Sequence, residues 1–323
     1  MELAPGLHRI DTELGTRVSS LYLFAGADAS LLFDTGVDGT AQRDLAPYLA
    51  AHDLDPGRVR WAVISHADVD HFGGLASVRE LAPGAAIVAH RLDAPLIADY
   101  GVYEDERGRG FRTPWDLDEH PDTLAWTREV TREGPLDLTI TGGERVRLSD
   151  DWEVELVHAP GHSRGHLAVW DPRSRSLVVS DAVLSDAVLH ADGAPAFPPT
   201  YRFVDNYLAT IARFEAMAPE HLLTAHYPTM DAASGAAFLA ASRAFAEGLD
   251  RAVHDAVSVT GERGCTLAEL LDELNPRVGR WPAEGTASAL AFPVVGHLER
   301  ALQYGTLAMV RDVSGPARVR SST

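Results

Sequence analysis

Apolar residues in the first ninety positions alternate between runs of strand length and positions spaced as on one face of a helix. The runs predict strands over residues 18–25, 30–34, 59–65 and 86–89, and the helical spacing predicts helices over residues 40–52 and 75–81. A short turn would join the first two strands as a hairpin. Strands that alternate with helices in this way are typical of an α/β fold.

The middle of the chain continues this pattern but contains two stretches without clear periodicity. Further strands are predicted over residues 136–140, 146–148, 154–158, 167–170, 177–180 and 222–225, and a helix over residues 205–218. The stretches without periodicity are residues 100–135 and 184–201. We expect both to be irregular surface segments that shape a binding pocket. Candidates for its apolar wall are Tyr103, Phe111, Trp115 and Phe197.

After residue 230 the chain changes to alanine-rich helical sequence. Helices are predicted over residues 236–257, 266–274 and 289–304, the second beginning with Thr266 as N-cap and Glu269 at the capping-box position. Residues 307–311 and 317–320 would then pair as a β-ribbon across Ser314 and Gly315. This order of elements is that of a winged helix. We therefore expect a main domain over residues 1–230 and a helical, winged-helix-like domain over residues 231–323, packed against the first or against a dimer partner.

Composition excludes several kinds of chemistry. The chain has 28 arginines and no lysine, so neither a Schiff-base lysine nor a P-loop lysine is available. Cys265 is the single cysteine, which rules out an intrachain disulfide and a cysteine-rich metal site. A net charge of −19 opposes binding to nucleic acid or an anionic membrane, and no apolar run is long enough to span a bilayer. We expect a cytoplasmic protein from a GC-rich bacterium that acts on a small molecule, and leave a homodimer open.

The strongest chemical signal is SHADVDHFGG, residues 65–74, which follows an apolar strand and opens a helix. His66, Asp68 and Asp70 project to one side of an extended segment, and the turn into the helix brings His71 beside them. Carboxylates this close repel each other, so the cluster indicates a bound cation. A two-metal site needs more ligands, which we expect at the ends of other strands. The candidates there are His162, Asp181 and His226.

Taken together, these residues resemble the signature of the metallo-β-lactamase superfamily. That signature is an acidic residue after an early strand, an H-x-H-x-D-H segment, and later a histidine, an aspartate and a histidine. In this chain the corresponding positions are Asp34, residues 66–71, His162, Asp181 and His226. The resemblance covers residues 1 to about 228 and implies an αββα sandwich with a dinuclear metal site at one edge. More weakly, the rest of the chain resembles the winged-helix extension of some hydrolases in the superfamily.

The resemblance also implies which residues bind each metal. The first metal would take His66, Asp68 and His162, the second Asp70, His71 and His226, with Asp181 bridging and Asp34 in support. One position departs from the family, because Asp68 stands where the motif has a second histidine. An extra oxygen ligand shifts the preference toward iron or manganese, and an acidic residue of this kind occurs in the flavodiiron branch. Carboxylates are also ordinary zinc ligands, so zinc is the metal we expect first.

A metal-dependent hydrolase is the activity that these residues predict. A metal-bridged hydroxide would attack an ester, lactone, thioester or amide of a small molecule. Asp70 would orient this nucleophile and carry its proton. Tyr227, next to His226, is a second catalytic candidate as a hydrogen-bond donor to the substrate, with a place in the core as the alternative. His158 and His166 match no ligand position, and we expect supporting or surface roles for both.

Three other functions fit the motif less well. A flavodiiron-like oxidoreductase needs a flavin domain, for which the C-terminal segment has no glycine-rich pattern, although oxygenase chemistry at a diiron centre stays open. A nuclease would need a basic surface, which the acidic first 230 residues do not offer. A non-catalytic scaffold would tolerate the loss of ligands, whereas the ligand set here is complete.

Overall fold

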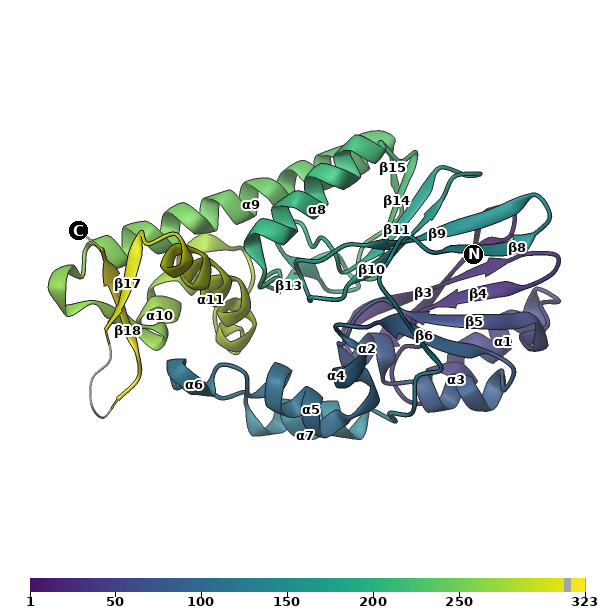
Figure 1. Cartoon of the computed structure of the whole chain (residues 1–323), viewed down its shortest axis with the longest axis horizontal. Coiled ribbons are helices and arrows are strands. Elements are labelled where there is room, and N and C mark those ends of the chain that lie inside the picture. Colours follow the sequence, from purple (N-terminus) through teal and green to yellow (C-terminus); the bar gives the residue numbers. More distant parts are fainter. Residues whose placement is uncertain (311–314, 323) are drawn as a thin grey trace.

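Two β-sheets packed face to face, with helices on both outer sides, form the larger part of the computed structural model, which describes residues 1–310 and 315–322 (Figure 1). The first sheet has the strand order β1 (Glu2–Ala4), β2 (Leu7–Leu14), β3 (Arg17–Ala25), β4 (Ser30–Phe33), β5 (Val59–Ile64), β6 (Ala86–His90) and β7 (Leu138–Ile140). The second has the order β15 (Met230–Asp231), β14 (His221–Thr224), β11 (Ser176–Ser180), β10 (Leu167–Asp171), β9 (Trp152–His158) and β8 (Arg145–Ser149). The αββα sandwich is therefore confirmed; β1 and β2 were not predicted.

Burial on both faces explains why the central strands are apolar throughout. In β4, Leu31 and Phe33 pack between the sheets, while Leu32 packs against the outer helices. In β11, Val178 lies between the sheets and Leu177 under the helices on the other side. Side chains alternate across a strand, so a strand with helices on one face and a sheet on the other needs apolar residues at every position.

The outer helices follow the strands that they cover. On the first sheet these are η1 (Ala41–Leu45), α1 (Ala46–Ala51), η2 (Pro56–Arg58), α2 (Val69–Phe72) and α3 (Leu75–Leu81). The second sheet is covered by α8 (Val204–Met217) and by the first half of α9 (Ala232–Ser258). Within the described residues, none of the helices combines the length and the apolarity that crossing a lipid bilayer requires.

The segment expected to be irregular over residues 100–135 is largely helical, which corrects the sequence analysis. After α4 (Ala94–Ala98) it contains α5 (Tyr100–Tyr103), η3 (Glu104–Gly108), α6 (Arg112–Trp115) and α7 (Pro121–Glu129). Each is short, so no apolar stripe repeats often enough to reveal a helix. The second such segment, residues 184–201, contains only the small hairpin of β12 (Val188–Leu189) and β13 (Pro195–Phe197).

The C-terminal part has the predicted order of elements. After α9 come η4 (Gly261–Arg263), β16 (Cys265–Thr266), α10 (Leu267–Val278), α11 (Ala287–Gln303), β17 (Leu307–Val310) and β18 (Arg318–Ser321). Thr266 and Glu269 form the predicted capping box at the start of α10. β18 pairs with both β16 and β17. Arg311 and Ser314 of the predicted ribbon lie outside the described residues.

The helix α9 connects the sandwich to the C-terminal part (Figure 1). Phe238 in its first half packs with α8 and the second sheet, whereas Leu249 in its second half packs with α10 and α11. Phe111 and Trp115 also belong to this C-terminal core. Their predicted place in the pocket wall is therefore wrong. The C-terminal part thus packs against the segment of short helices over residues 100–129. A boundary near residue 230 stays a prediction, because one helix contributes to both cores.

Candidate metal centre

The carboxyl ends of neighbouring strands meet at one edge of the sandwich and carry the predicted ligands into the loops that follow. In the first sheet, Asp34 follows β4 and His66 follows its parallel neighbour β5. In the second sheet, His162 follows β9, Asp181 follows β11 and His226 follows the parallel strand β14. Residues that are far apart in the sequence motif are therefore brought to the same edge of the sandwich, each by the strand that precedes it.

The three residues predicted for the first metal lie together. The Oδ2 atom of Asp68 is 3.0 Å from His162 Nε2 and 3.5 Å from His66 Nε2. Ligands at about 2.0–2.1 Å around a tetrahedral ion stand roughly 3.3 Å apart, so these spacings suit donors of one shared cation. Burial lowers the pKa of His66 to about 4, with help from the neighbouring imidazoles, so His66 is neutral, as a ligand must be.

The three residues predicted for the second metal form a matching group. Asp70 Oδ2 lies 3.5 Å from both His71 Nε2 and His226 Nε2. Each histidine also donates a hydrogen bond from its other ring nitrogen. His71 Nδ1 donates to Asp34 at 2.9 Å, and His226 Nδ1 donates to the Val18 carbonyl at 2.8 Å. These hydrogen bonds fix the tautomer and direct the Nε2 lone pairs into the site.

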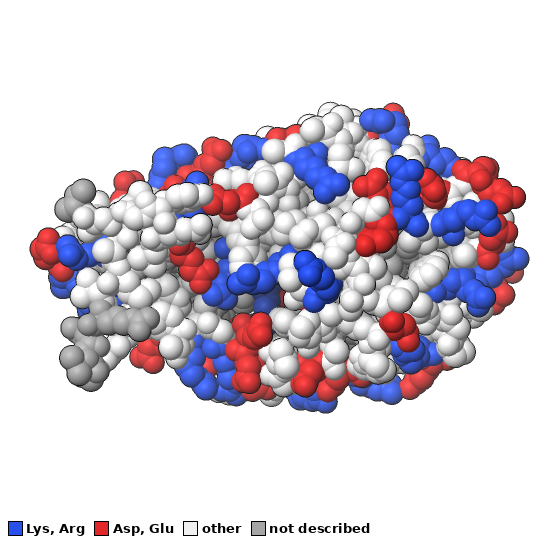
Figure 2. All heavy atoms as spheres, in the orientation of Figure 1, with Lys and Arg blue, Asp and Glu red and all other residues white. Residues whose placement is uncertain are grey.

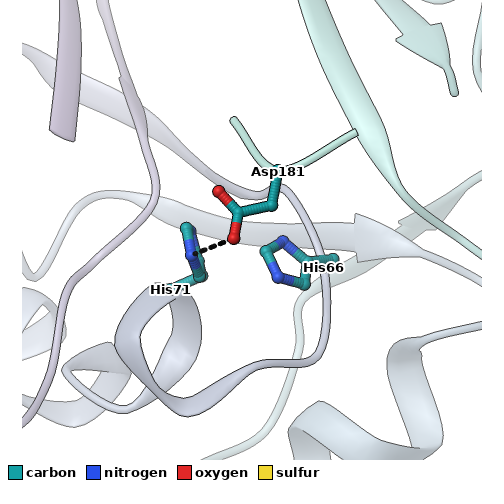
Figure 3. Close-up of side chains that lie close together, drawn as sticks. All are labelled: His66, His71 and Asp181. Carbon is teal, nitrogen blue, oxygen red and sulfur yellow. Dashed lines mark ion pairs between the residues drawn. The ribbon is translucent and has the colours of Figure 1, made fainter. Parts of the chain in front are cut away.

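Asp181 joins the two groups. Its carboxylate lies between His66 and His71, with Oδ2 3.7 Å from His71 Nε2 and 3.1 Å from His226 Nε2 (Figure 3). His66, His71 and Asp181 place donor atoms within 4.8 Å of one another, as do the two groups of three. This is the position expected of a residue that serves both metals.

Unpartnered polar atoms show that the site fits cations. Within the described residues, His66 Nε2, His71 Nε2 and Asp181 Oδ1 are buried without a hydrogen-bond partner. Leaving such atoms unsatisfied costs roughly 1–3 kcal/mol each, and divalent ions would satisfy all three. The donor set of imidazoles and carboxylates suits zinc, iron or manganese.

Asp34 supports the site from behind and is not itself among the clustered ligands. It adopts a left-handed backbone conformation with φ of 68° and is buried. Its carboxylate accepts hydrogen bonds from His71, from the Ser65 amide and hydroxyl, and from the Ser180 hydroxyl. It therefore ties the loops after β4, β5 and β11 together, the role that the resemblance implied.

Arg107, which was not predicted as a site residue, lies against the candidate ligand Asp68. Asp68 occupies the N-cap position of α2, yet its carboxylate makes no capping hydrogen bond. Instead it accepts two hydrogen bonds from Arg107, at 2.5 and 2.6 Å. Burial opposes the ionisation of Asp68, but Arg107 and His162 outweigh it and hold its pKa well below the usual range. Arg107 belongs to the segment expected to be irregular, so nothing in the spacing pointed to it.

The loop that carries His162 is held in place by two close contacts. A side chain at Gly161 would meet the Tyr207 backbone at 2.6 Å, so only glycine fits this turn. Buried Asp93 accepts hydrogen bonds from Ser163 Oγ and from the Gly165 amide. Asp93 was not predicted, because it contacts this loop only through the fold.

The other two histidines take different positions. His158 hydrogen-bonds the Arg164 carbonyl and stacks on His90, away from the ligand groups. His166 is buried and stacks on His66 at a ring distance of 4.7 Å. Within the described residues neither of its nitrogens has a partner. As expected, neither residue is among the clustered ligands.

Tyr227 does not have the geometry of a catalytic donor, which corrects our expectation. Its hydroxyl lies 2.5 Å from the Leu184 carbonyl and 2.7 Å from the Ala187 carbonyl, and its ring packs against Phe238. Burial raises the pKa of Tyr227 well above its ordinary value. The single hydroxyl proton is committed to these carbonyls, so Tyr227 is a core residue.

A cavity of about 700 Å³ opens over the ligand groups. Asp68, Asp70, Asp181 and His226 reach its floor; other lining residues include Arg17, Tyr103, Arg107, Trp126, Phe197, Thr200, Ser288 and Phe292. The last two come from α11, so the C-terminal part contributes to the cavity wall. In Figure 2 this face is hollowed near its centre, and arginine side chains gather around the hollow.

Comparison with known proteins identifies the family. The model of the metallo-beta-lactamase superfamily matches residues 14–226, which contain every predicted ligand. The chain belongs to this superfamily. A metallo-beta-lactamase family protein from Thermus thermophilus has a TM-score of 0.75 at 19% identity, covering 99% of both chains. A beta-lactamase domain protein from Burkholderia ambifaria has a TM-score of 0.73 at 18% identity, covering 99% of this chain and 94% of that one. At these identities the likeness shows the fold, and it extends through the C-terminal part.

Sequence relatives of this superfamily member include enzymes. Acyl-coenzyme A thioesterase MBLAC2 of Bos taurus is 26% identical, and that of Homo sapiens 25%, each over 68% of this chain and 76% of its own length. A probable metallo-hydrolase of Mycobacterium tuberculosis is 35% identical over 34% of this chain and 32% of its own. Together with the clustered ligands, the family identifies the chain as a metallo-hydrolase.

Proposed function

We propose that this metallo-hydrolase cleaves an ester, lactone, thioester or amide bond in a small acyl compound. A thioester is the first candidate substrate. The observation that carries the proposal is the convergence of the predicted ligands into two groups joined by Asp181. Zinc is the expected metal, with iron or manganese as alternatives. The preference for a thioester is supported by the MBLAC2 relatives.

The residues around the cavity divide the work of such a reaction. Two bound divalent ions would lower the pKa of water and polarise the acyl carbonyl. Asp70 lines the cavity beside His71 and His226, where its carboxylate can orient the attacking water and pass the proton to the leaving group. Tyr103, Phe197 and Phe292 would hold the apolar part of the acyl group.

The second candidate is a non-haem diiron oxidoreductase or oxygenase. Its supporting observation is Asp68, an oxygen donor where the superfamily motif has a histidine. Arg107 neutralises this carboxylate and weakens the argument for iron. Consumption of dioxygen would separate this candidate from a hydrolase.

The test is a panel of acyl-CoA, short thioester, p-nitrophenyl ester, lactone and amide substrates, offered to protein of measured metal content. Turnover should be metal-dependent and should continue without dioxygen. His226→Ala and Asp181→Ala should reduce it by more than the roughly 10- to 100-fold typical of changes behind the ligands. The control is His221→Ala, an exposed histidine at the start of β14, the strand that leads to His226. Full activity in either ligand variant would overturn the proposal, as would turnover only with dioxygen.

A further inference from the structure

Asp68 takes part in two interactions at once. On one side its two oxygens accept hydrogen bonds from Arg107 Nε and Nη2, a fork in which both side chains are mostly buried, 19% and 15% exposed. On the other side Oδ2 faces His162 and His66 at 3.0 and 3.5 Å. A carboxylate has about four lone-pair positions, and the fork occupies two of them. Asp68 can therefore remain a metal ligand while it is paired with Arg107.

We infer that Arg107 cancels the charge of Asp68, so that the pair offers the first metal a neutral oxygen donor in place of the neutral imidazole of the superfamily motif. The inference rests on the proposed metal centre. It explains how the chain can carry a third carboxylate among its ligands. An unpaired Asp68 would bind a cation more tightly, and Arg107 lowers that affinity by competing for the same oxygens.

Arg107 is held for this task from the opposite side of the cavity. Its guanidinium lies over the Phe292 ring of α11, 4.2 Å from the ring centre. The helix α11 is itself fixed to the sandwich, because Arg202 pairs with Glu299 and Tyr201 hydrogen-bonds His297. A residue nearly two hundred positions later in the chain thereby fixes the partner of a metal ligand. Other titratable groups close to Arg107 are Asp93, Tyr103 and His162.

A charge-swap experiment tests this inference. Metal-free protein is titrated with Zn²⁺ in competition with a chromophoric chelator, and the number and affinity of bound ions are compared for wild type, Arg107→Met, Asp68→His and the double variant. The Arg107→Met variant should bind the first metal, the ion next to Asp68, at least about tenfold more tightly, because Asp68 is freed. Asp68→His should bind that ion at least about tenfold more weakly, because Arg107 is left unpaired beside the cation. The double variant should return to two ions with wild-type affinity.

Two further variants keep the result interpretable. Arg109→Met removes the next arginine of the same segment, which pairs with Glu104 outside the ligand groups, and should leave both affinities unchanged. Arg107→Lys keeps the positive charge beside Asp68 without the fork, and its zinc affinity should stay near that of wild type. This variant can be compared with Asp68→His even where Arg107→Met misfolds. Weaker zinc binding in Arg107→Met, or a double variant that binds zinc no better than Asp68→His, would overturn the inference.

The result is independent of turnover. If wild type binds two ions and the swap restores binding, but no acyl substrate is hydrolysed, the proposed function fails and the inference about Arg107 stands. If acyl substrates are hydrolysed and the double variant binds no better than Asp68→His, the inference fails and the proposed function stands.

Discussion

Arg17 is a cavity residue whose guanidinium stacks on an aromatic ring. Within residues 1–310 and 315–322 it forms no ion pair, and its guanidinium lies 4.9 Å from the centre of the Phe197 ring. It is next to Val18, whose carbonyl holds His226, so it stands close to the second ligand group. An arginine held beside a reactive centre in an acidic chain is suited to bind an anionic group of the substrate.

We expect Arg17→Met to raise KM by about 10- to 100-fold for thioesters with a carboxylate or phosphate, because a charge-assisted hydrogen bond contributes roughly 1.5–3 kcal/mol. Neutral thioesters with the same acyl chain should be affected by less than about threefold. Comparing acyl-CoA, a carboxylated acyl group on a short neutral thiol, and its uncharged analogue shows which anion is bound.

Arg164→Met is the matched control for Arg17→Met. Arg164 also stacks on a phenylalanine, Phe203 at 4.7 Å, but it does not line the cavity. Equal losses for charged and neutral substrates in Arg17→Met would contradict the prediction.

At the scale of single residues, sequence reasoning singled out the residues that cluster as candidate ligands, because they follow apolar strands in a fixed order. It missed Arg107 and Asp93, whose roles depend on contacts between segments far apart in the chain. It misjudged Tyr227 because proximity in sequence to a ligand does not determine where a hydroxyl points. Contacts of these kinds are set by tertiary packing, which a single sequence does not display.

At the scale of elements, the joint between α9 and α11 contains a partly buried polar network. His297 of α11 lies 2.9 Å from Asp250 of α9, and Arg300 pairs with the same carboxylate at 3.0 Å. His297 also contacts the Tyr201 hydroxyl at 3.0 Å. The hydrogen bond from His297, together with the electrostatic interaction between the two side chains, lowers the pKa of Asp250 to about 2. The network fixes the helix that carries Phe292 to the cavity.

This pKa predicts a pH dependence for the joint. An aspartate whose pKa falls from 3.8 to about 2 on folding stabilises the protein above pH 4 and loses that contribution as the pH falls toward 2. Asp250→Asn should therefore lower the midpoint of thermal unfolding by about 2–5 °C near neutral pH, and the difference should shrink below pH 4. Asp255→Asn, an exposed position on the same helix, is the control and should change the midpoint little. A difference that stays constant down to pH 3 would refute this account.

Elements with a dominant apolar pattern were predictable, and those without one were not. The central strands and α9 bury long apolar stretches. In β2, by contrast, polar and charged residues interrupt the apolar ones, although most of them are buried and paired, as Thr12 is with the Ser19 carbonyl. The short helices over residues 100–129 likewise present too few turns for a periodic signal.

At the scale of the whole molecule, the net charge of −19 includes a concentration of carboxylates at the metal centre. Burial would lower the pKa of His71, yet Asp70, Asp34 and Asp181 raise it well above the ordinary 6.5, and Asp181 and Asp70 likewise raise that of His226. Without metal, the site therefore takes up protons. Those protons stabilise the fold at low pH, and their contribution is lost as the pH rises through the raised values.

Metal ions should replace these protons as the pH rises, because a histidine must be neutral to bind a metal. Removing metal with a chelator should lower the midpoint of thermal unfolding, and adding Zn²⁺ should restore it. At a free Zn²⁺ concentration of a hundred times Kd, binding adds about 2.7 kcal/mol to the free energy of unfolding. The stabilisation should be larger at pH 8 than at pH 6. His71→Ala should lose most of this response, whereas His221→Ala, outside the site, should keep it. An effect of zinc that is the same at both pH values, or that survives in His71→Ala, would mean that the ions bind elsewhere on this acidic molecule.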